Sequence, residues 1–327
     1  MCGISYYGMA CYWAAMQQPP HLSAIVPYEA LTDEYGDVVR QGGLWHSGFQ
    51  KHWYNNTVVP QQYGKLEGLS EEQLIKQRFD YDALATNWVW RSEGPWPILD
   101  HARDLAKIKV PMLTAGNWMD SEVHLPGNPT SYERASSEWK FLEMHTGNHL
   151  AAYYERDQIQ RQLEFLDYFL KGKTDNGLKE SPHIDLLIRK GIENFYRAEN
   201  AWPPTDATQT HLYLAPNRLL SFEQYKASSP DDALSYSGLT GENFFQTEPL
   251  REKLEILGFP HLDLTVSTDA KEWISSSTST SSTSMARNSS LEAITTSLQC
   301  RLFEAGSVSH IVRYRAGRRP TGRCWNR

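Results

Sequence analysis

The first 17 residues hold the feature that most constrains the fold. Gly3-Ile4-Ser5-Tyr6-Tyr7-Gly8 places a serine between two glycines, and a run of small residues follows directly. A serine that acts as a nucleophile is held on a sharp strand-to-helix turn, where glycines give the backbone room. The pattern predicts such a turn at Ser5 and a helix over 6–17, which Pro19-Pro20 ends. The alternative is an ordinary turn, because short glycine motifs recur by chance.

The sequence after this turn resembles the serine hydrolases grouped with X-prolyl dipeptidyl-peptidases and cocaine esterase. The matching segments are Ser5-Tyr6, Ala14-Ala15, Pro19-Pro20-His21-Leu22-Ser23-Ala24-Ile25 and Asp33-Glu34-Tyr35. The resemblance covers about residues 1–270. It implies an α/β fold: a partial α/β-hydrolase core with a helical cap insertion, followed by a β-sandwich domain of the jelly-roll type.

Changes in pattern along the chain predict its domains. Residues 1–27 and 98–173 are expected to form the hydrolase core, incomplete at its N-terminus. Residues 28–97 lack a strand pattern and are rich in aromatic residues, so they are expected to form the cap. In the related hydrolases such a cap covers the acyl pocket, although each tryptophan could equally pack in a small cap core. Residues 174–270 are assigned to an incomplete jelly-roll domain.

The candidate orienting carboxylate is Asp120. It follows the apolar run Val110–Gly116, which is typical of a buried strand, and sheet enzymes place catalytic groups just beyond the carboxyl ends of strands. Asn117-Trp118-Met119-Asp120 resembles the Gly-Trp-Tyr-Asp of the related hydrolases. A loop aspartate that faces solvent is the alternative.

The candidate base is His149. Trp139–His145 is typical of a last core strand, and the loop after it ends at His149, which matches the terminal histidine of the related hydrolases. The resemblance implies that Ser5 attacks an acyl carbon, His149 takes its proton, Asp120 fixes the imidazole tautomer and the Tyr6 backbone N–H donates to the oxyanion. The chain order serine, aspartate, histidine is that of α/β-hydrolases.

No metal or other cofactor is expected. His145 and His149 are four residues apart, which is the spacing of a metal-binding pair on a helix. However, no glutamate follows the first histidine, and Gly147 lies between the two.

The sequence changes character after an amphipathic helix predicted over Asp157–Leu170. Short alternating runs at Ile184–Arg189, His211–Leu214 and His261–Ser267 are separated by turn residues, which is typical of an antiparallel sandwich. No catalytic residue is assigned to this part.

Residues 271–327 do not continue the sandwich pattern. Ser275–Ser284 is almost wholly serine and threonine, and basic sequence runs from there to Arg327. One interpretation is a natural Ser/Thr-rich tail. The other is a shift of reading frame after about Ala270, and we expect that these residues do not fold as strands of the sandwich.

The start of the chain also departs from the related hydrolases. An elbow serine needs a strand before it, and only Met1–Ile4 precede Ser5. The related hydrolases take a second oxyanion donor from a tyrosine upstream of the elbow, which this sequence does not include. The expectation is therefore an N-terminally truncated serine hydrolase that cleaves an ester or amide acyl bond and, by the resemblance, releases X-Pro dipeptides. The alternative is a non-catalytic remnant that binds through its sandwich domain.

Charge and composition exclude some partners. The net charge of −7 argues against nucleic acid, which needs a basic surface. The sequence has neither a run of 18 apolar residues nor a signal-peptide pattern, so no membrane partner is expected and the cytoplasm is the expected compartment. Its four cysteines lie far apart, which suits free thiols. The expected partners are a small ester, an amide or a short peptide as substrate, and further copies of the chain in a homo-oligomer.

Overall fold

The computed structural model describes residues 1–315 apart from short stretches. Those outside the description are 63–67, 78–79, 121, 191–192, 227–232, 236–241, 252–253, 259–261, 267–271, 287–288, 304–311 and 316–327. The chain divides into two compact units, Met1–Pro204 and Thr205–Arg327.

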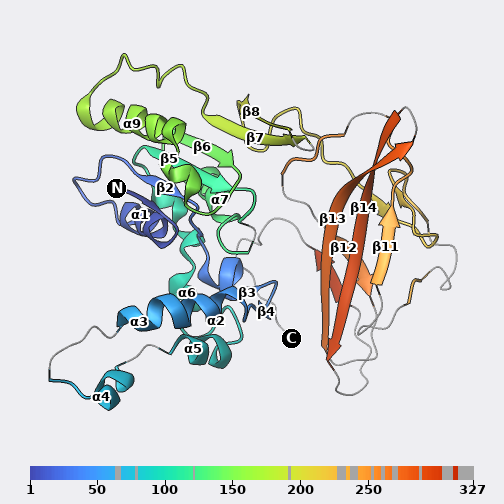
Figure 1. Ribbon diagram of the computed structural model, residues 1–327, viewed down its shortest axis with the longest axis horizontal. Helices are drawn as coiled ribbons and strands as arrows, with labels where there is room; N and C mark the ends of the chain where they lie inside the picture. The colour runs from blue at the N-terminus through green and yellow to red at the C-terminus, as the bar shows by residue number, and fades with distance from the viewer. Residues whose placement is uncertain are drawn as a thin grey trace. The chain divides into compact units, whose positions relative to one another are not determined.

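The first unit is built on a six-stranded sheet with the order β1-β2-β5-β6-β7-β8 (Figure 1). The strands are β1 (Cys2–Ile4), β2 (Val26–Tyr28), β5 (Met112–Asn117), β6 (Lys140–His145), β7 (Ile184–Lys190) and β8 (Glu193–Glu199). The first five are parallel, and β8 pairs with β7 in the antiparallel direction. Because the carboxyl ends of parallel strands share one edge, the loops after these strands converge there.

Helices cover both faces of this sheet, and the strand residues alternate between the two cores. They are α1 (Tyr6–Met16), α7 (Gly127–Arg134), α8 (Ala151–Tyr154) and α9 (Arg156–Lys171). Ile25 and Met112 belong to the core that includes α1, whereas Val26 and Leu113 belong to the core that includes Phe165 of α9. Figure 1 shows α1 and α9 on opposite sides of the sheet.

Two helices confirm the local sequence predictions. Helix α1 begins directly after Ser5, as the elbow pattern predicts. Helix α9 buries Phe165 and ends at Gly172, which has the left-handed φ of 67° that favours glycine at a helix C-terminus. The buried Tyr12 hydroxyl fixes α1 to the sheet, since it lies 2.7 Å from both the Thr114 and Ser131 hydroxyls.

Gly8 gives α1 its close approach to the sheet. A Cβ atom at this position would lie 2.8 Å from both the Cβ of Ala30 and the carbonyl oxygen of Tyr28. Backbone cannot move aside easily, so a side chain here overpacks the contact.

We therefore expect Gly8→Ala to destabilise the protein by about 1–3 kcal/mol. Gly48→Ala is the matched control, because its added methyl would lie no nearer than 3.7 Å to another group, the His46 ring. Urea denaturation of both variants checks this prediction, and equal stability of the two would contradict it.

After β2, residues 29–97 form short elements rather than further strands of the main sheet. These are the pair β3 (Arg40–Gln41) and β4 (Leu44–Trp45), the π-helices Glu34–Val39 and Tyr54–Val58, and the α-helices α2 (Phe49–Trp53), α3 (Val59–Gln62), α4 (Glu71–Lys76), α5 (Tyr81–Asn87) and α6 (Trp96–Leu99). The 3-10 turns His101–Arg103 and Leu105–Lys107 lead to β5. Trp96 is fully buried in the core that also contains α1 residues. Ser70 and Gln73 form a capping box at the start of α4, the helix labelled in Figure 1.

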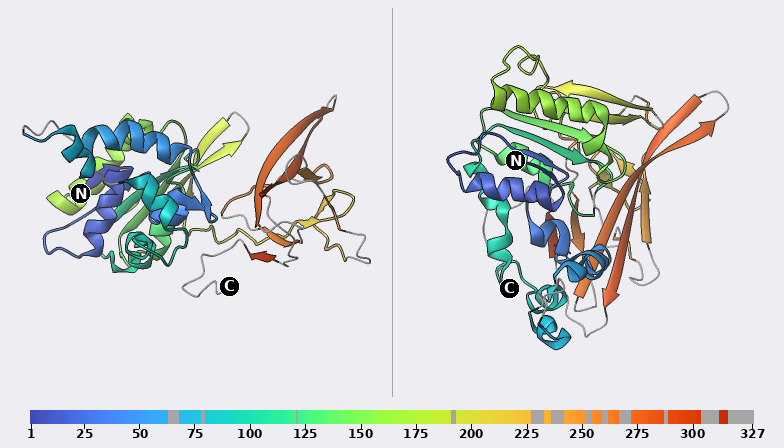
Figure 2. Two further views of the ribbon diagram at one scale, coloured as in Figure 1. Left: turned by 90° about the horizontal axis from the view of Figure 1, so that it is seen from below. Right: turned by 60° about the vertical axis from the view of Figure 1, so that its left-hand side comes forward.

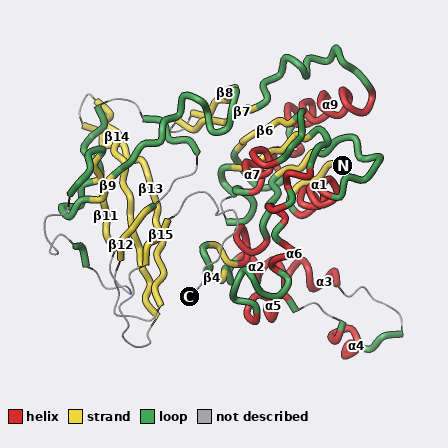
Figure 3. The backbone as a smooth tube through the Cα atoms, turned by 180° about the vertical axis from the view of Figure 1, so that it is seen from behind, coloured by secondary structure: helices red, strands yellow, loops and turns green. Residues whose placement is uncertain are grey.

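The described regular elements of the second unit are all strands (Figures 2 and 3). They are β9 (Tyr213–Leu214), β10 (Leu220–Ser221), β11 (Glu242–Gln246), β12 (Asp263–Val266), β13 (Glu272–Ala286), β14 (Ser289–Phe303) and β15 (Val312–Arg315). The pairs β9–β10 and β12–β15 are antiparallel, and β14 pairs with both β11 and β13. This part of the chain is β-rich, as predicted.

Two details differ from the sequence analysis. Ile184–Arg189, predicted as the first sandwich run, lies in β7 and extends the main sheet beside β6. A short apolar run shows that a strand forms but not which sheet it joins. Residues after about 270 were expected not to fold as strands of the sandwich, but they hold β13 and β14, whose pairing runs from Glu272↔Phe303 to Ala286↔Ser289, and β14 also pairs with β11. Threonine and alternating apolar residues favour strands. The high serine content of this segment hid that preference in the sequence. A shift of reading frame stays a prediction.

Candidate active site

Ser5 lies at the carboxyl end of β1, at the turn into α1. Its backbone has φ 60° and ψ −129°, a conformation that is rare for a residue with a side chain. The Ser5 N–H donates to the Tyr28 carbonyl 3.0 Å away, which ties the turn to β2. A Cβ atom at Gly3 would lie 2.6 Å from Tyr7, so the turn needs a glycine there. This geometry is that of the elbow predicted from the sequence.

The Ser5 hydroxyl is in contact with a histidine. Ser5 Oγ lies 3.0 Å from Nε2 of His124, and Nδ1 of the same ring contacts a carboxylate oxygen of Asp120. His124 is buried and lies between Asp120 and the start of α7. The order hydroxyl, imidazole, carboxylate is the arrangement used in serine-based acyl transfer.

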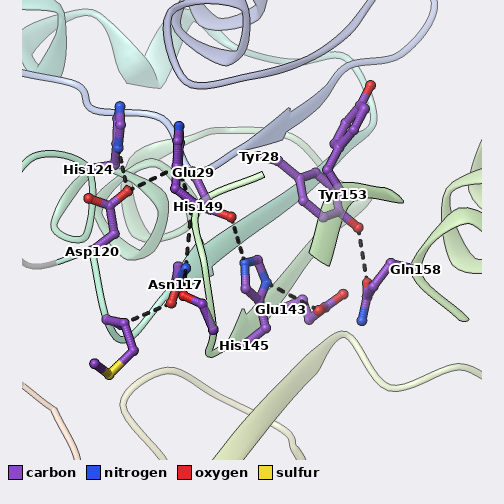
Figure 4. A network of polar contacts seen from close by, with 12 residues as sticks. Tyr28, Glu29, Asn117, Asp120, His124, Glu143, His145, His149, Tyr153 and Gln158 are labelled. Carbon is purple, nitrogen blue, oxygen red and sulfur yellow. Dashed lines mark hydrogen bonds and ion pairs between the residues drawn. The ribbon is translucent and has the colours of Figure 1, made fainter. Parts of the chain in front are cut away.

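The structure places the three predicted residues in one cluster, but with different partners from those expected. Asp120 Oδ2 lies 3.5 Å from Nδ1 of His149, while Glu29 Oε2 lies 2.6 Å from that nitrogen (Figure 4). The His149 ring is stacked on the His124 ring, with centroids 4.9 Å apart and planes 7° apart. His149 therefore lies beside the histidine that contacts Ser5.

Glu29 is the residue that directly follows β2. It is fully buried and has φ 39°, a strained value for a residue with a side chain. Its carboxylate contacts His149, His145 Nε2 at 3.1 Å and Asn117 Nδ2 at 3.3 Å. The site thus draws on the carboxyl ends of four neighbouring strands, β1, β2, β5 and β6.

Buried charges fix the protonation of this cluster. Burial raises the pKa of Glu29, but the hydrogen bonds from His145 and His149 outweigh it and lower that pKa to about 2. Burial lowers the pKa of His145, but the carboxylates of Glu143 and Glu29 raise it to about 9. Burial likewise lowers the pKa of His149, and Glu29 with Asp120 raises it above its usual value. Glu29 is therefore ionised at neutral pH.

These shifts predict how stability depends on pH. The depressed pKa of Glu29 contributes stability above its unfolded value of 4.5, which is lost as the pH falls through about 2. The raised pKa of His145 contributes stability below its unfolded value of 6.5, which is lost as the pH rises through about 9. We expect the free energy of unfolding to fall between pH 6.5 and 9, and Glu29→Gln to reduce that slope.

Urea denaturation at several pH values measures this slope. Glu72→Gln is the control, because Glu72 forms an exposed ion pair with Lys76 on α4, outside the buried cluster. A slope that is the same in Glu29→Gln as in the unchanged chain would show that the cluster does not set the pH dependence.

The same cluster offers donor atoms at the spacing a metal ion needs. One atom each of Asp120, His124 and His149 lie within 4.8 Å of one another. Nδ1 of each histidine contacts a carboxylate, and Ser5 lies against Nε2 of His124. The pairing of His145 with His149, considered from the sequence, takes the form of a shared contact with Glu29.

Tyr6, the predicted oxyanion donor, is the first residue of α1. The first N–H groups of a helix have no partner within the helix, so they are free to face an anion. The Tyr6 side chain is 45% exposed, and its ring lies 6.4 Å from the ring of Trp53 in α2. An aromatic residue of segment 28–97 thus lies close to the elbow.

Sequence reasoning missed Glu29 and His124. A signal for Glu29 was present in the apolar run Ala24-Ile25-Val26 shortly before it, because sheet enzymes place functional groups just beyond the ends of such strands. His124 is four residues after Asp120 and contacts it through a turn. A spacing of four residues brings two side chains together in a helical turn, so it could have indicated this contact.

The chain has a mixed α/β fold with a parallel sheet core, followed by a β-rich C-terminal part. Residues 1–151 match the family model of X-Pro dipeptidyl-peptidases (S15 family), and residues 176–278 match the model of the X-Pro dipeptidyl-peptidase C-terminal non-catalytic domain. The chain belongs to this S15 hydrolase family.

Solved structures share the fold. Two structures of a CocE/NonD family hydrolase from Staphylococcus aureus have a TM-score of 0.70 at 24% and 23% identity, with 88% and 95% of this chain covered. An α-amino acid ester hydrolase has a TM-score of 0.66 at 17% identity, with 94% of this chain and 70% of its own covered. An aminopeptidase from a marine sediment archaeon, Thaumarchaeota archaeon, has a TM-score of 0.65 at 16% identity, covering 93% and 69%. A comparison with curated proteins found no match.

The chain spans about half the length of the S. aureus structures, of which 50% and 52% are covered. No helix among the described residues is both long and apolar enough to cross a membrane.

Proposed function

We propose that this chain hydrolyses an ester or amide bond through a covalent acyl intermediate on Ser5. The observation that carries the proposal is the Ser5 hydroxyl, held at a strained strand-to-helix turn 3.0 Å from a histidine that itself contacts a carboxylate. Ser5 Oγ attacks the acyl carbon while its proton passes to a histidine, which then protonates the leaving group. A water molecule then attacks the acyl carbon in the same way, giving its proton to the histidine, and the acid is released as Ser5 regains its proton. The Tyr6 N–H donates to the oxyanion.

Two histidines are candidates for the base. His149 is the residue that the sequence predicts, and His124 is the residue that the Ser5 hydroxyl contacts in the described arrangement. In each case the Nδ1 contact with a carboxylate leaves Nε2 to accept a proton.

The family supports peptides and esters as substrates. Within that class we propose dipeptides with proline in the second position as acyl groups, because the family is that of the X-Pro dipeptidyl-peptidases. Assembly into a homo-oligomer stays a prediction.

Pre-steady-state kinetics with a p-nitrophenyl ester tests the proposal on the full chain. We expect a burst of p-nitrophenol equal to the enzyme concentration, because an activated ester acylates Ser5 faster than water removes the acyl group. EDTA should leave the burst unchanged. Faster release of p-nitroaniline from X-Pro than from X-Ala substrates would support the finer proposal. A folded chain that releases p-nitrophenol no faster than buffer alone would instead support the non-catalytic alternative.

A further inference from the structure

Glu29 is held in a strained and closely defined position, which a carboxylate with a purely structural role does not require. It directly follows β2, whose neighbour β1 carries Ser5 at the same edge of the sheet. Its φ of 39° is strained, and its N–H is held by the Ala115 carbonyl at 2.7 Å. Strain of this kind persists where the surrounding structure fixes it, which is common at functional sites.

The contacts of Glu29 converge on the histidine cluster. The carboxylate is fully buried, and three donors surround it: His145 Nε2, His149 Nδ1 and Asn117 Nδ2 (Figure 4). A buried carboxylate is tolerated only where such donors replace water. Of the three donors, His149 makes the shortest contact, at 2.6 Å.

The two carboxylates near His149 are not equivalent. Nδ1 of His149 lies 2.6 Å from Glu29 and 3.5 Å from Asp120. A hydrogen bond from nitrogen to oxygen is normally 2.7–3.2 Å long, so only Glu29 is within that reach. Asp120 instead contacts Nδ1 of His124.

We propose that Glu29, not Asp120, is the positioning carboxylate of His149, and that the pair His149–Glu29 takes the proton from Ser5. This inference rests on the proposed function of Ser5 and assigns the partners within it. Because a carboxylate only accepts, Nδ1 of His149 carries the hydrogen and Nε2 offers its lone pair.

Accessibility favours His149 over His124 in this role. The side chain of His149 is 39% exposed, whereas that of His124 is 7% exposed. The base must reach the leaving group and then a water molecule, both of which approach from outside. The His149 ring is stacked on the His124 ring that Ser5 contacts, with the ring centroids 4.9 Å apart.

Proton transfer balances within this group. The Ser5 O–H bond breaks as Oγ bonds to the acyl carbon, and the proton moves to Nε2 of His149. The imidazolium is stabilised by Glu29, which remains ionised, and the proton then passes to the leaving group. The charged groups that face His149 are Glu29, Asp120 and His145, with His124 stacked on its ring.

The test is the rate at which an alkyl fluorophosphonate labels the full chain, measured from pH 5 to 9. In Glu29→Gln we expect labelling near neutral pH to slow by about a hundredfold or more, as when the carboxylate of a triad is removed. The acidic limb of the profile should also move to lower pH, because the carboxylate raises the pKa of His149. A purely structural role would lower the rate without moving that limb.

Glu143→Gln is the matched control. Glu143 is a fully buried glutamate of the same network, but its described contacts are with His145 at 3.5 Å and Arg161 at 3.7 Å. It should keep the position of the acidic limb. Glu29→Asp keeps the charge and should also keep the limb, which covers the case in which Glu29→Gln fails to fold by circular dichroism.

The outcomes separate this inference from the proposed function. The role of Glu29 is overturned if Ser5 is labelled but Glu29→Gln keeps both the labelling rate and the position of the acidic limb. It is also overturned if folded Glu29→Asp moves the acidic limb as a neutral residue would. In both cases the proposed serine hydrolase stands. If Ser5 is never labelled, the proposed function fails first.

Discussion

Ser5→Ala is expected to reduce ester hydrolysis to the background rate, a loss of about a millionfold if the site works as other serine hydrolases do. The reason is that, on our proposal, Ser5 Oγ is the atom that forms the acyl bond, and it lies 3.0 Å from His124 Nε2. The measurement is steady-state turnover of a p-nitrophenyl ester, with stability checked by thermal unfolding.

Ser23→Ala is the control for this experiment, since Ser23 is an exposed serine before β2. It should keep the activity of the unchanged chain. Hydrolysis that survives Ser5→Ala would mean that the activity belongs to another group.

His149→Ala is expected to give the second largest loss, about a hundredfold to ten-thousandfold, which is the usual contribution of a general base. His124→Ala should cost less, because on our account His124 holds the Ser5 hydroxyl rather than taking its proton. Both variants should be compared by labelling with the fluorophosphonate, because that reaction reports on acylation alone.

The rival arrangement makes the opposite prediction. If Ser5, His124 and Asp120 act together, then His124→Ala and Asp120→Asn should be equally damaging, and His149→Ala should be mild.

On our account His149 and Glu29 act as a unit, and the effects of substitutions within a unit are not additive. The double variant of His149 and Glu29 should therefore lose no more activity than the worse single variant.

Local patterns account for what could be predicted of the fold. The elbow and α9 depend on glycines, small residues and a helical apolar period, all of which lie within one short stretch. The place of β7 was not predictable in the same way, because its partner β6 is some 40 residues earlier in the chain and pairing depends on that distant contact. The serine-rich β13 and β14 stabilise each other through their pairing, which composition does not reveal.

The residues of the candidate site differ in the same way: local motifs indicate some of them, whereas others depend on distant contacts. Ser5, Asp120 and His149 carry motifs that point to them, and the structure brings all three to one edge of the sheet. The partner of His149 could not be predicted, since Glu29 meets His149 across 120 positions of sequence. Choosing between two carboxylates depends on a difference of under 1 Å in distance, 2.6 Å against 3.5 Å, that only the folded chain defines.

One measurement tests the central claim most directly: peptide mass spectrometry of the full chain after reaction with a fluorophosphonate. Our account predicts a single phosphonate adduct, and predicts that it lies on Ser5, within the peptide that begins at Met1. A folded chain without an adduct, or with the adduct on another residue, would contradict the claim that Ser5 is a nucleophile.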